Sequence, residues 1–136
     1  MSGWLETEVL EKRVWTDALF SLRVRGPQPA FEAGQFVRIA LDLEGERVAR
    51  AFSFVNAPSD PVSEFYGVVV PEGRLSPPLA ALRPGDSLQL STLASGFLVL
   101  SEVPEAAVLW MISTGTKLSC CFIICFFCAM NIRPFR

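Results

Sequence analysis

Apolar and polar residues alternate in short stretches over the first hundred residues, a pattern typical of half-buried β-strands. Between residues 18 and 24, Leu19, Ser21 and Arg23 alternate with Phe20, Leu22 and Val24. Similar β-prone runs predict further strands at residues 6–11, 35–41, 47–55, 65–70 and 87–91. About six strands at this spacing predict an all-β fold, a small antiparallel barrel or sandwich.

Glycine, proline and small polar residues separate these predicted strands. Gly26-Pro27 breaks the chain, and Glu44-Gly45-Glu46 predicts a tight hairpin turn. Residues 76–82 predict one short helix, with Ser76 as its N-cap, because proline is favoured at the first helical position.

The composition changes near residue 103. Residues 107–112 are a continuous apolar run, and a Gly/Thr loop that ends at Thr116 follows them. Such a run before such a loop predicts the first buried strand of a parallel sheet. We therefore expect a barrel domain at 1–102, the start of an α/β domain at 103–116, and an aberrant Cys/Phe-rich tail at 117–136.

The tail contains all four cysteines, which are Cys120, Cys121, Cys125 and Cys128. Phe and Ile lie between them, whereas zinc and iron–sulfur ligands usually sit in polar or glycine-containing loops, so we expect no metal site. The apolar stretch 118–130 is 13 residues long, shorter than the roughly 20 that span a bilayer. A tail anchor remains an alternative to our main expectation, an aggregation-prone segment without a role.

The composition of the chain argues against several functional classes, among them nucleic-acid binding and histidine-dependent catalysis. The 136 residues have a net charge of −2, from twelve basic and fourteen acidic side chains, and no basic stripe predicts nucleic-acid binding. The chain contains no histidine, which excludes Ser–His and Cys–His catalysis and most zinc sites. The amino terminus has no apolar run typical of a signal peptide, so we expect a cytoplasmic protein.

The segment Arg50-Ala51-Phe52-Ser53 contains the most informative candidate residues. A guanidinium can pair with a pyrophosphate through two hydrogen bonds, an aromatic ring can stack on an isoalloxazine, and a serine can bond a ring nitrogen. The segment therefore suggests flavin binding. Taken alone, Arg50 also fits a solvated residue at a strand end, and Phe52 and Tyr66 fit an ordinary barrel core.

The order of several further motifs makes the interpretation more specific. Residues 4–116 resemble the bacterial ferredoxin (flavodoxin)–NADP+ reductases in the stretches 15–22, 33–36, 45–58, 64–66, 73–77, 82–86 and 109–116. The resemblance implies a six-stranded antiparallel Greek-key barrel that binds FAD, and then an NADP-binding α/β domain, here incomplete. It also implies NADP(H) as the second cofactor and ferredoxin or flavodoxin as the partner.

The resemblance also implies roles for individual residues. Arg50 would contact the FAD pyrophosphate, Phe52 would stack on the flavin or its ribityl chain, and Ser53 would lie at the redox-active nitrogen as the catalytic residue. The other residues that would bind the cofactor are Ala51, Tyr66, Gly67, Val68, Val69, Arg74, Leu75, Ser76 and Thr116. Arg74, Leu75 and Ser76 would hold phosphate through backbone N–H groups, a use that suits a helix start.

The sequence departs from the family in two respects. Phe52 replaces the usual tyrosine, with the loss of a hydrogen bond worth about 0.5–1.5 kcal/mol. The family also continues beyond the loop that ends at Thr116 with the rest of the NADP domain and a tail over the flavin. From the sequence we expect weak FAD binding and little NADPH-dependent turnover. The alternative is a non-enzymatic barrel that binds flavin or a partner protein.

Overall fold

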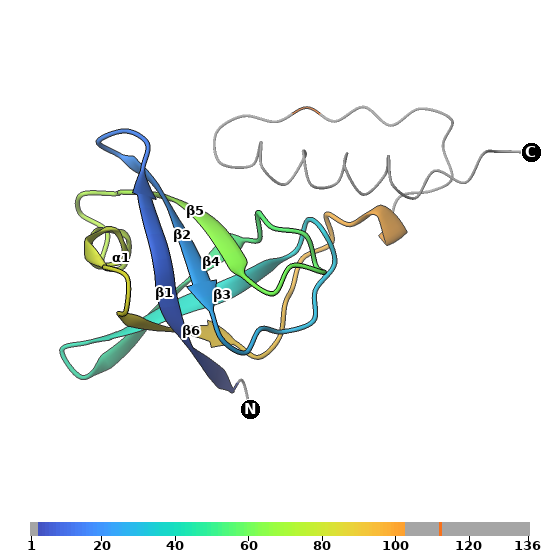
Figure 1. Ribbon diagram of the computed structural model, residues 1–136, viewed down its shortest axis with the longest axis horizontal. Coiled ribbons are helices and arrows are strands. Elements are labelled where there is room, and N and C mark those ends of the chain that lie inside the picture. The colour runs from blue at the N-terminus through green and yellow to red at the C-terminus, as the bar shows by residue number, and fades with distance from the viewer. Residues whose placement is uncertain (1–2, 103–111, 113–136) are drawn as a thin grey trace, which may run out of the picture.

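The computed structural model describes residues 3–102 and residue 112 of the chain. Six strands and one α-helix make up this part (Figure 1). In chain order they are β1 (Trp4–Val14), β2 (Leu19–Arg25), β3 (Phe36–Leu43), β4 (Glu46–Ser53), β5 (Ser63–Val68), α1 (Ser76–Ala81) and β6 (Ser87–Ser91). A single 3₁₀ turn, Leu100–Glu102, follows the last strand.

The six strands form one curled antiparallel sheet in the order β4-β3-β6-β1-β2-β5. Strand β6, the last in the chain, lies between β3 and β1, as in a Greek key. A β-bridge between Phe54, directly after β4, and Phe65 of β5 connects the two edge strands of the sheet. The predicted all-β fold with six antiparallel strands and one short helix is confirmed.

The inner face of the curled sheet encloses the hydrophobic core. The predicted alternation in β2 is confirmed, because Phe20, Leu22 and Val24 are buried whereas Arg23 is exposed. The largest fully buried side chains are Phe54 and Phe65, at the bridge, and the ring of Phe31 stacks on Phe54 with centroids 3.7 Å apart. Burial of these aromatic rings therefore holds the two edges of the sheet together.

The structure places some strand ends differently from the prediction. Strand β1 covers residues 4–14, not 6–11, because it pairs with two neighbours in succession, first β6 and then β2. Strand β5 begins at Ser63 and ends at Val68. The hairpin at Glu44-Gly45 is confirmed, with φ values of 53° and 83° that suit a tight turn between antiparallel strands.

The prediction that Ser76 caps the helix is wrong. The N-cap of α1 is Leu75, and no side chain of the described residues caps the helix. The Ser76 hydroxyl instead accepts a hydrogen bond from the Val70 backbone N–H, at 2.9 Å. This bond closes the loop before the helix, so the serine stabilises the loop rather than the first helical turn.

The expected strand at 107–112, the tail with its cysteines, and Thr116 lie outside the described residues, apart from residue 112. In the part that the structure describes, no helix is long and apolar enough to cross a membrane.

Candidate functional site

Strand β4 carries the four residues of the segment 50–53 at an edge of the sheet. Arg50 lies opposite Ile39 and Phe52 opposite Val37. Because Ile39 and Val37 are core residues and paired residues share a face, Arg50 and Phe52 lie on the inner face. Ala51 and Ser53 alternate with them and lie on the outer face.

Arg50 is exposed although it lies on the inner face, because β4 is an edge strand. Its Nη1 donates a hydrogen bond to its neighbour's carbonyl oxygen, that of Ala49, at 2.7 Å. Within the described residues, every ion pair of an arginine involves Arg23, Arg25, Arg47 or Arg74. Arg50 therefore has a guanidinium that no described carboxylate neutralises, as a phosphate-binding arginine requires.

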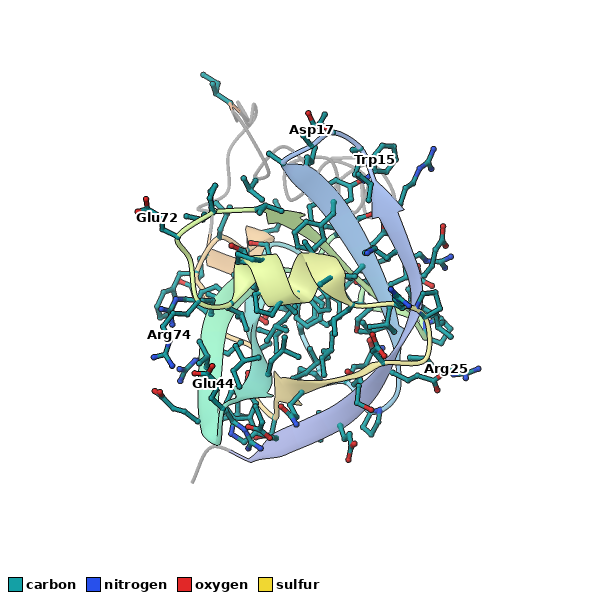
Figure 2. All side chains as sticks on the ribbon, turned by 90° about the vertical axis from the view of Figure 1, so that its left-hand side faces the viewer. Trp15, Asp17, Arg25, Glu44, Glu72 and Arg74 are labelled. Carbon is teal, nitrogen blue, oxygen red and sulfur yellow. The ribbon has the colours of Figure 1, made fainter. Side chains whose placement is uncertain are left out.

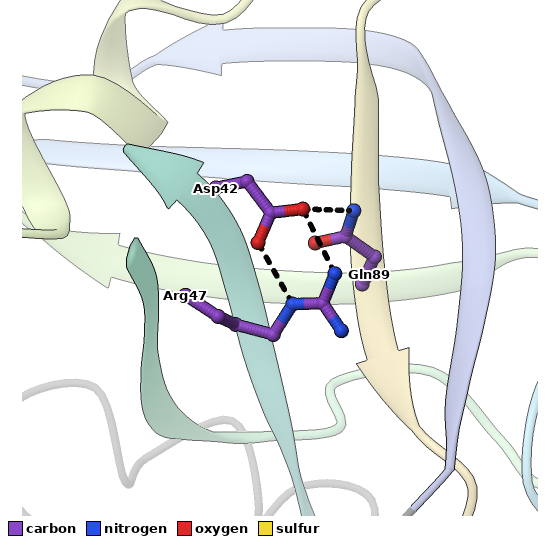
Figure 3. Close-up of polar contacts among 3 residues, drawn as sticks. All are labelled: Asp42, Arg47 and Gln89. Atoms are coloured by element: carbon purple, nitrogen blue, oxygen red, sulfur yellow. Dashed lines mark hydrogen bonds and ion pairs between the residues drawn. The ribbon is translucent and has the colours of Figure 1, made fainter. Parts of the chain in front are cut away.

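Arg47 shows the contrasting arrangement three residues earlier on the same strand (Figure 3). Its guanidinium donates two hydrogen bonds of 2.8 Å to the Asp42 carboxylate, and Gln89 donates a third to Asp42 at 3.4 Å. The bond from Arg47 lowers the pKa of Asp42 below its usual value. Arg47 is thus a structural partner of Asp42 on the outer face.

The loop from Val70 to Ser76 lies between β5 and α1 and contains the second predicted phosphate contact. The Arg74 guanidinium donates to the Glu46 carboxylate at 2.7 Å, which links the loop to the start of β4. That bond lowers the pKa of Glu46. Because Glu46 and Arg50 are four positions apart on one strand, they share its inner face, and the loop lies on the Arg50 side of β4.

The backbone of this loop suits an anion. Among the hydrogen bonds of the described residues, none uses the N–H groups of Arg74, Leu75 or Ser76 as donors. The next two residues are prolines, Pro77 and Pro78, which have no N–H. The Leu75 side chain is buried in the core, so only its backbone can contact a ligand. Three backbone donors that have no acceptor among the described residues, on the Arg50 side of β4, fit a pyrophosphate.

Ser53 and Tyr66 lie next to each other across the bridge that joins the sheet edges. Phe54 pairs with Phe65, so Ser53, one residue before, and Tyr66, one residue after, are the next pair in register. Both side chains point to the outer face, opposite the buried phenylalanines. Phe52 and Tyr66 therefore lie on different faces, and an aromatic clamp of these two rings on one face is not formed.

The three residues after Tyr66 differ in what they can contribute. A Cβ at Gly67 would lie 2.4 Å from the Phe20 ring, so this glycine makes room for a core side chain. Val68 is exposed, on the outer face. Val69 donates its N–H to the Ala18 carbonyl at 2.7 Å and packs partly against the core. Of these three residues, only Val68 presents an exposed side chain.

Sequence reasoning did not assign a role to Trp15 or Ser21, which lie beside Tyr66. The Trp15 ring approaches Tyr66 edge-on, with centroids 6.3 Å apart, and its Nε1 donates to the Ser21 hydroxyl at 3.1 Å. Figure 2 shows Trp15 at the β1–β2 hairpin, away from Arg74 at the other side of the barrel. The sequence holds no local signal for this contact, because the burial of Ser21 on the outer face of β2 is visible only in the structure.

Comparison with known proteins identifies relatives of the chain. It is 52% identical over 118 residues to the flavodoxin/ferredoxin–NADP reductases of Shigella flexneri and Escherichia coli K12, a match that covers 87% of this chain and 48% of each relative. The ferredoxin–NADP reductase of Azotobacter vinelandii is 38% identical over 120 residues. No family model matches the chain.

Solved structures agree with the sequence relatives. The crystal structure of a ferredoxin NADP+ reductase from Neisseria gonorrhoeae, with bound FAD and NADP, superimposes with a TM-score of 0.84 at 27% identity. The superposition covers 90% of this chain and 50% of that protein, and the chain spans about half the length of the curated relatives it matches. Over the part that it shares with them, the chain is homologous to the flavodoxin/ferredoxin–NADP reductases.

Proposed function

We propose that the barrel is the FAD-binding domain of a ferredoxin/flavodoxin–NADP reductase. The observation that carries this proposal is the combination at one edge of the sheet. Among the residues that the structure describes, the exposed Arg50 guanidinium has no carboxylate partner, and the N–H groups of residues 74–76 have no acceptor. A barrel of the same fold belongs to a reductase with bound FAD and NADP.

Different residues at the β4 edge of the sheet contact different parts of FAD. Arg50 binds the pyrophosphate, and the backbone N–H groups of residues 74–76 share its charge. Phe52, partly buried against the core, gives the flavin or its ribityl chain a rigid apolar surface. Ser53 donates or accepts one hydrogen bond at the ring from the outer face, next to Tyr66 and Val68.

In the whole protein, the domain at 1–102 would act together with an NADP-binding domain that begins at 103–116, where Thr116 approaches the flavin. FAD, when bound, couples two-electron exchange with NADPH to one-electron exchange with ferredoxin or flavodoxin. The barrel residues orient the cofactor and set its electrostatic surroundings. Because NADPH and these carriers are shared within the cell, we place the reaction in the cytoplasm.

Titration of the purified chain with FAD tests the proposal. We expect a yellow complex and quenched flavin fluorescence. Arg50→Ala should raise the Kd about 10- to 100-fold, because a charge-assisted hydrogen bond is worth about 1.5–3 kcal/mol. Arg25→Ala is the matched control, since Arg25 is an exposed strand arginine paired with Glu8, and it should bind FAD as the wild type does.

Two results would contradict the proposal. One is a colourless barrel that takes up no FAD, which favours a partner-binding module. The other is unchanged FAD affinity in the Arg50→Ala variant, which would remove Arg50 from the pyrophosphate site.

A further inference from the structure

Three neighbouring strands bring a row of side chains together on the outer face of the barrel. Arg13 of β1 pairs in register with Ser21 of β2, and Ser21 pairs with Tyr66 of β5. Trp15 follows at the end of β1, where its N–H donates to the Leu19 carbonyl at 2.8 Å. Strand β2 lies between Trp15 and Tyr66, and their rings meet over Ser21 with centroids 6.3 Å apart.

Trp15 is held from three sides although 44% of its surface is exposed. Its Nε1 donates to the Ser21 hydroxyl at 3.1 Å, and the Arg13 guanidinium carbon lies 4.0 Å from the centre of its ring. Its edge contacts the Tyr66 ring at an interplanar angle of 66°. A half-exposed tryptophan with a fixed polar end and a stacked cation has few rotamers left.

A cavity of about 270 Å³ opens beside this contact, and Trp15, Tyr66, Ser21 and Glu64 are among the residues that line it. Tyr66 is thus not packed on every side, and Trp15 is the aromatic neighbour that contacts its ring. Without this contact, the tyrosine could turn towards the open space. Trp15 therefore bounds one side of the Tyr66 ring, and the cavity lies on another.

We propose that Trp15 is a positioning residue that holds the Tyr66 ring in the orientation in which it packs on the flavin. This inference rests on the proposed FAD site. A ring that is already oriented loses less conformational freedom on binding, so the cofactor binds more tightly. Arg13 acts one step further away, because it stacks on the Trp15 ring. Ser21 fixes the indole nitrogen of Trp15 and is also the β2 partner of Tyr66.

FAD titration of the full chain, combined with the visible spectrum of the bound flavin, tests the inference. Trp15→Phe keeps a ring but removes the bond to Ser21, and Ser21→Ala removes the same bond from the other side. Each should raise the Kd about 2- to 10-fold and shift the flavin bands. The double variant should bind no more weakly than either single variant, because both remove one interaction.

The same substitution in a variant that lacks the Tyr66 ring distinguishes a positioning role of Trp15 from a general contribution to folding stability. In Tyr66→Leu, the change Trp15→Phe should leave the Kd unaltered, because the ring that Trp15 orients is gone. Trp4→Phe is the matched control, since Trp4 lies at the start of β1, far from the end that precedes Trp15, with Arg38 and Arg47 near its ring, and the change should not affect FAD binding.

The possible failures are distinct. Wild-type chain that takes up no FAD would overturn the proposed function and this inference together. Normal uptake with the same Kd and spectrum in Trp15→Phe and Ser21→Ala would overturn only the inference. An equal loss of affinity for Trp15→Phe in the Tyr66→Leu background would also overturn it, because the effect would not pass through Tyr66.

Discussion

The inner and outer faces of strands β4 and β5 use similar residues for different purposes. On β4, the outer Arg47 is bound to Asp42 by two hydrogen bonds, whereas the inner Arg50 has no carboxylate partner among the described residues. On β5, the inner Gly67 makes room for the Phe20 ring, whereas the outer Tyr66 contacts Trp15 beside a cavity that both residues line. Alternation along each strand thus decides which residues build the barrel and which can contact a cofactor.

The difference between the positions along β4 also explains how the candidate phosphate site is exposed while the core stays covered. The inner face of β4 is covered at Val48 but open at Arg50. The loop at 70–76 is tied to the start of β4 through Arg74 and Glu46. An anion held here would lie at the margin of the sheet, next to the barrel interior but accessible from solvent.

The largest loss of folding stability should follow from a substitution that overpacks the inner face of the sheet. Gly67→Ala would place a Cβ at 2.4 Å from the Phe20 ring, and overpacking of this kind costs typically about 1–3 kcal/mol of stability. Val68→Ala, one residue later on the outer face, should change stability far less because Val68 is exposed. Urea unfolding of both variants measures the difference, and equal midpoints would show that the faces are not distinct.

Much of the fold was predictable from the sequence, because short-range signals specify it. Period-two alternation identified the inner residues of β2, and Glu44-Gly45 identified the hairpin. The full length of β1 was not predictable, because it reflects pairing with both β6 and β2, whose order depends on tertiary contacts.

The site was predictable in part. The motif pattern singled out Arg50 and the segment 74–76, and the structure places both on one side of β4. Local sequence misassigned Ser76 as a helix cap, because a hydroxyl can also bond a loop backbone, as it does at Val70. The contact between Trp15 and Tyr66 joins residues 51 positions apart, and no local pattern reports such a distance.

A smaller effect, on the affinity for FAD, should follow from adding a hydroxyl to the aromatic ring at position 52 on the edge strand β4. Phe52→Tyr adds a phenol to a side chain that is only partly buried, and one further hydrogen bond to FAD should lower the Kd about 2- to 10-fold. Phe54→Tyr is the contrasting change, because Phe54 is fully buried. There an unpaired hydroxyl should destabilise the barrel by about 1–3 kcal/mol.

Fluorescence titration and urea unfolding of the two variants distinguish these effects. Weaker FAD binding by Phe52→Tyr would show that the cofactor does not approach this ring as we propose. An unchanged unfolding midpoint for Phe54→Tyr would contradict the placement of Phe54 in the core.

The smallest effect is the pH-dependent contribution to stability of two glutamates, Glu64 and Glu46, which lie on opposite faces of the sheet. The two contributions differ in sign. Burial raises the pKa of Glu64, beside Tyr66, against the lowering effect of Arg23 and with contributions from Glu11 and Asp60 that also raise it. The hydrogen bond from Arg74 lowers the pKa of Glu46. A raised pKa means that the folded state disfavours the carboxylate, so Glu64 costs stability as the pH rises through its folded-state pKa. A lowered pKa means that Glu46 contributes stability above its unfolded-state pKa, and that this is lost as the pH falls.

Substitution by glutamine should therefore have opposite consequences at neutral pH. Glu64→Gln should be slightly more stable than the wild type at pH 7, and the advantage should shrink at pH 4, because that pH lies below the raised pKa of Glu64. Glu46→Gln should be slightly less stable at pH 7 and should approach the wild type in acid. Urea midpoints at the two pH values measure both differences. Only opposite pKa shifts produce opposite slopes of stability against pH. If both variants changed stability in the same direction at pH 7, the hydrogen bond from Arg74 and the burial of Glu64 would therefore not distinguish the two faces.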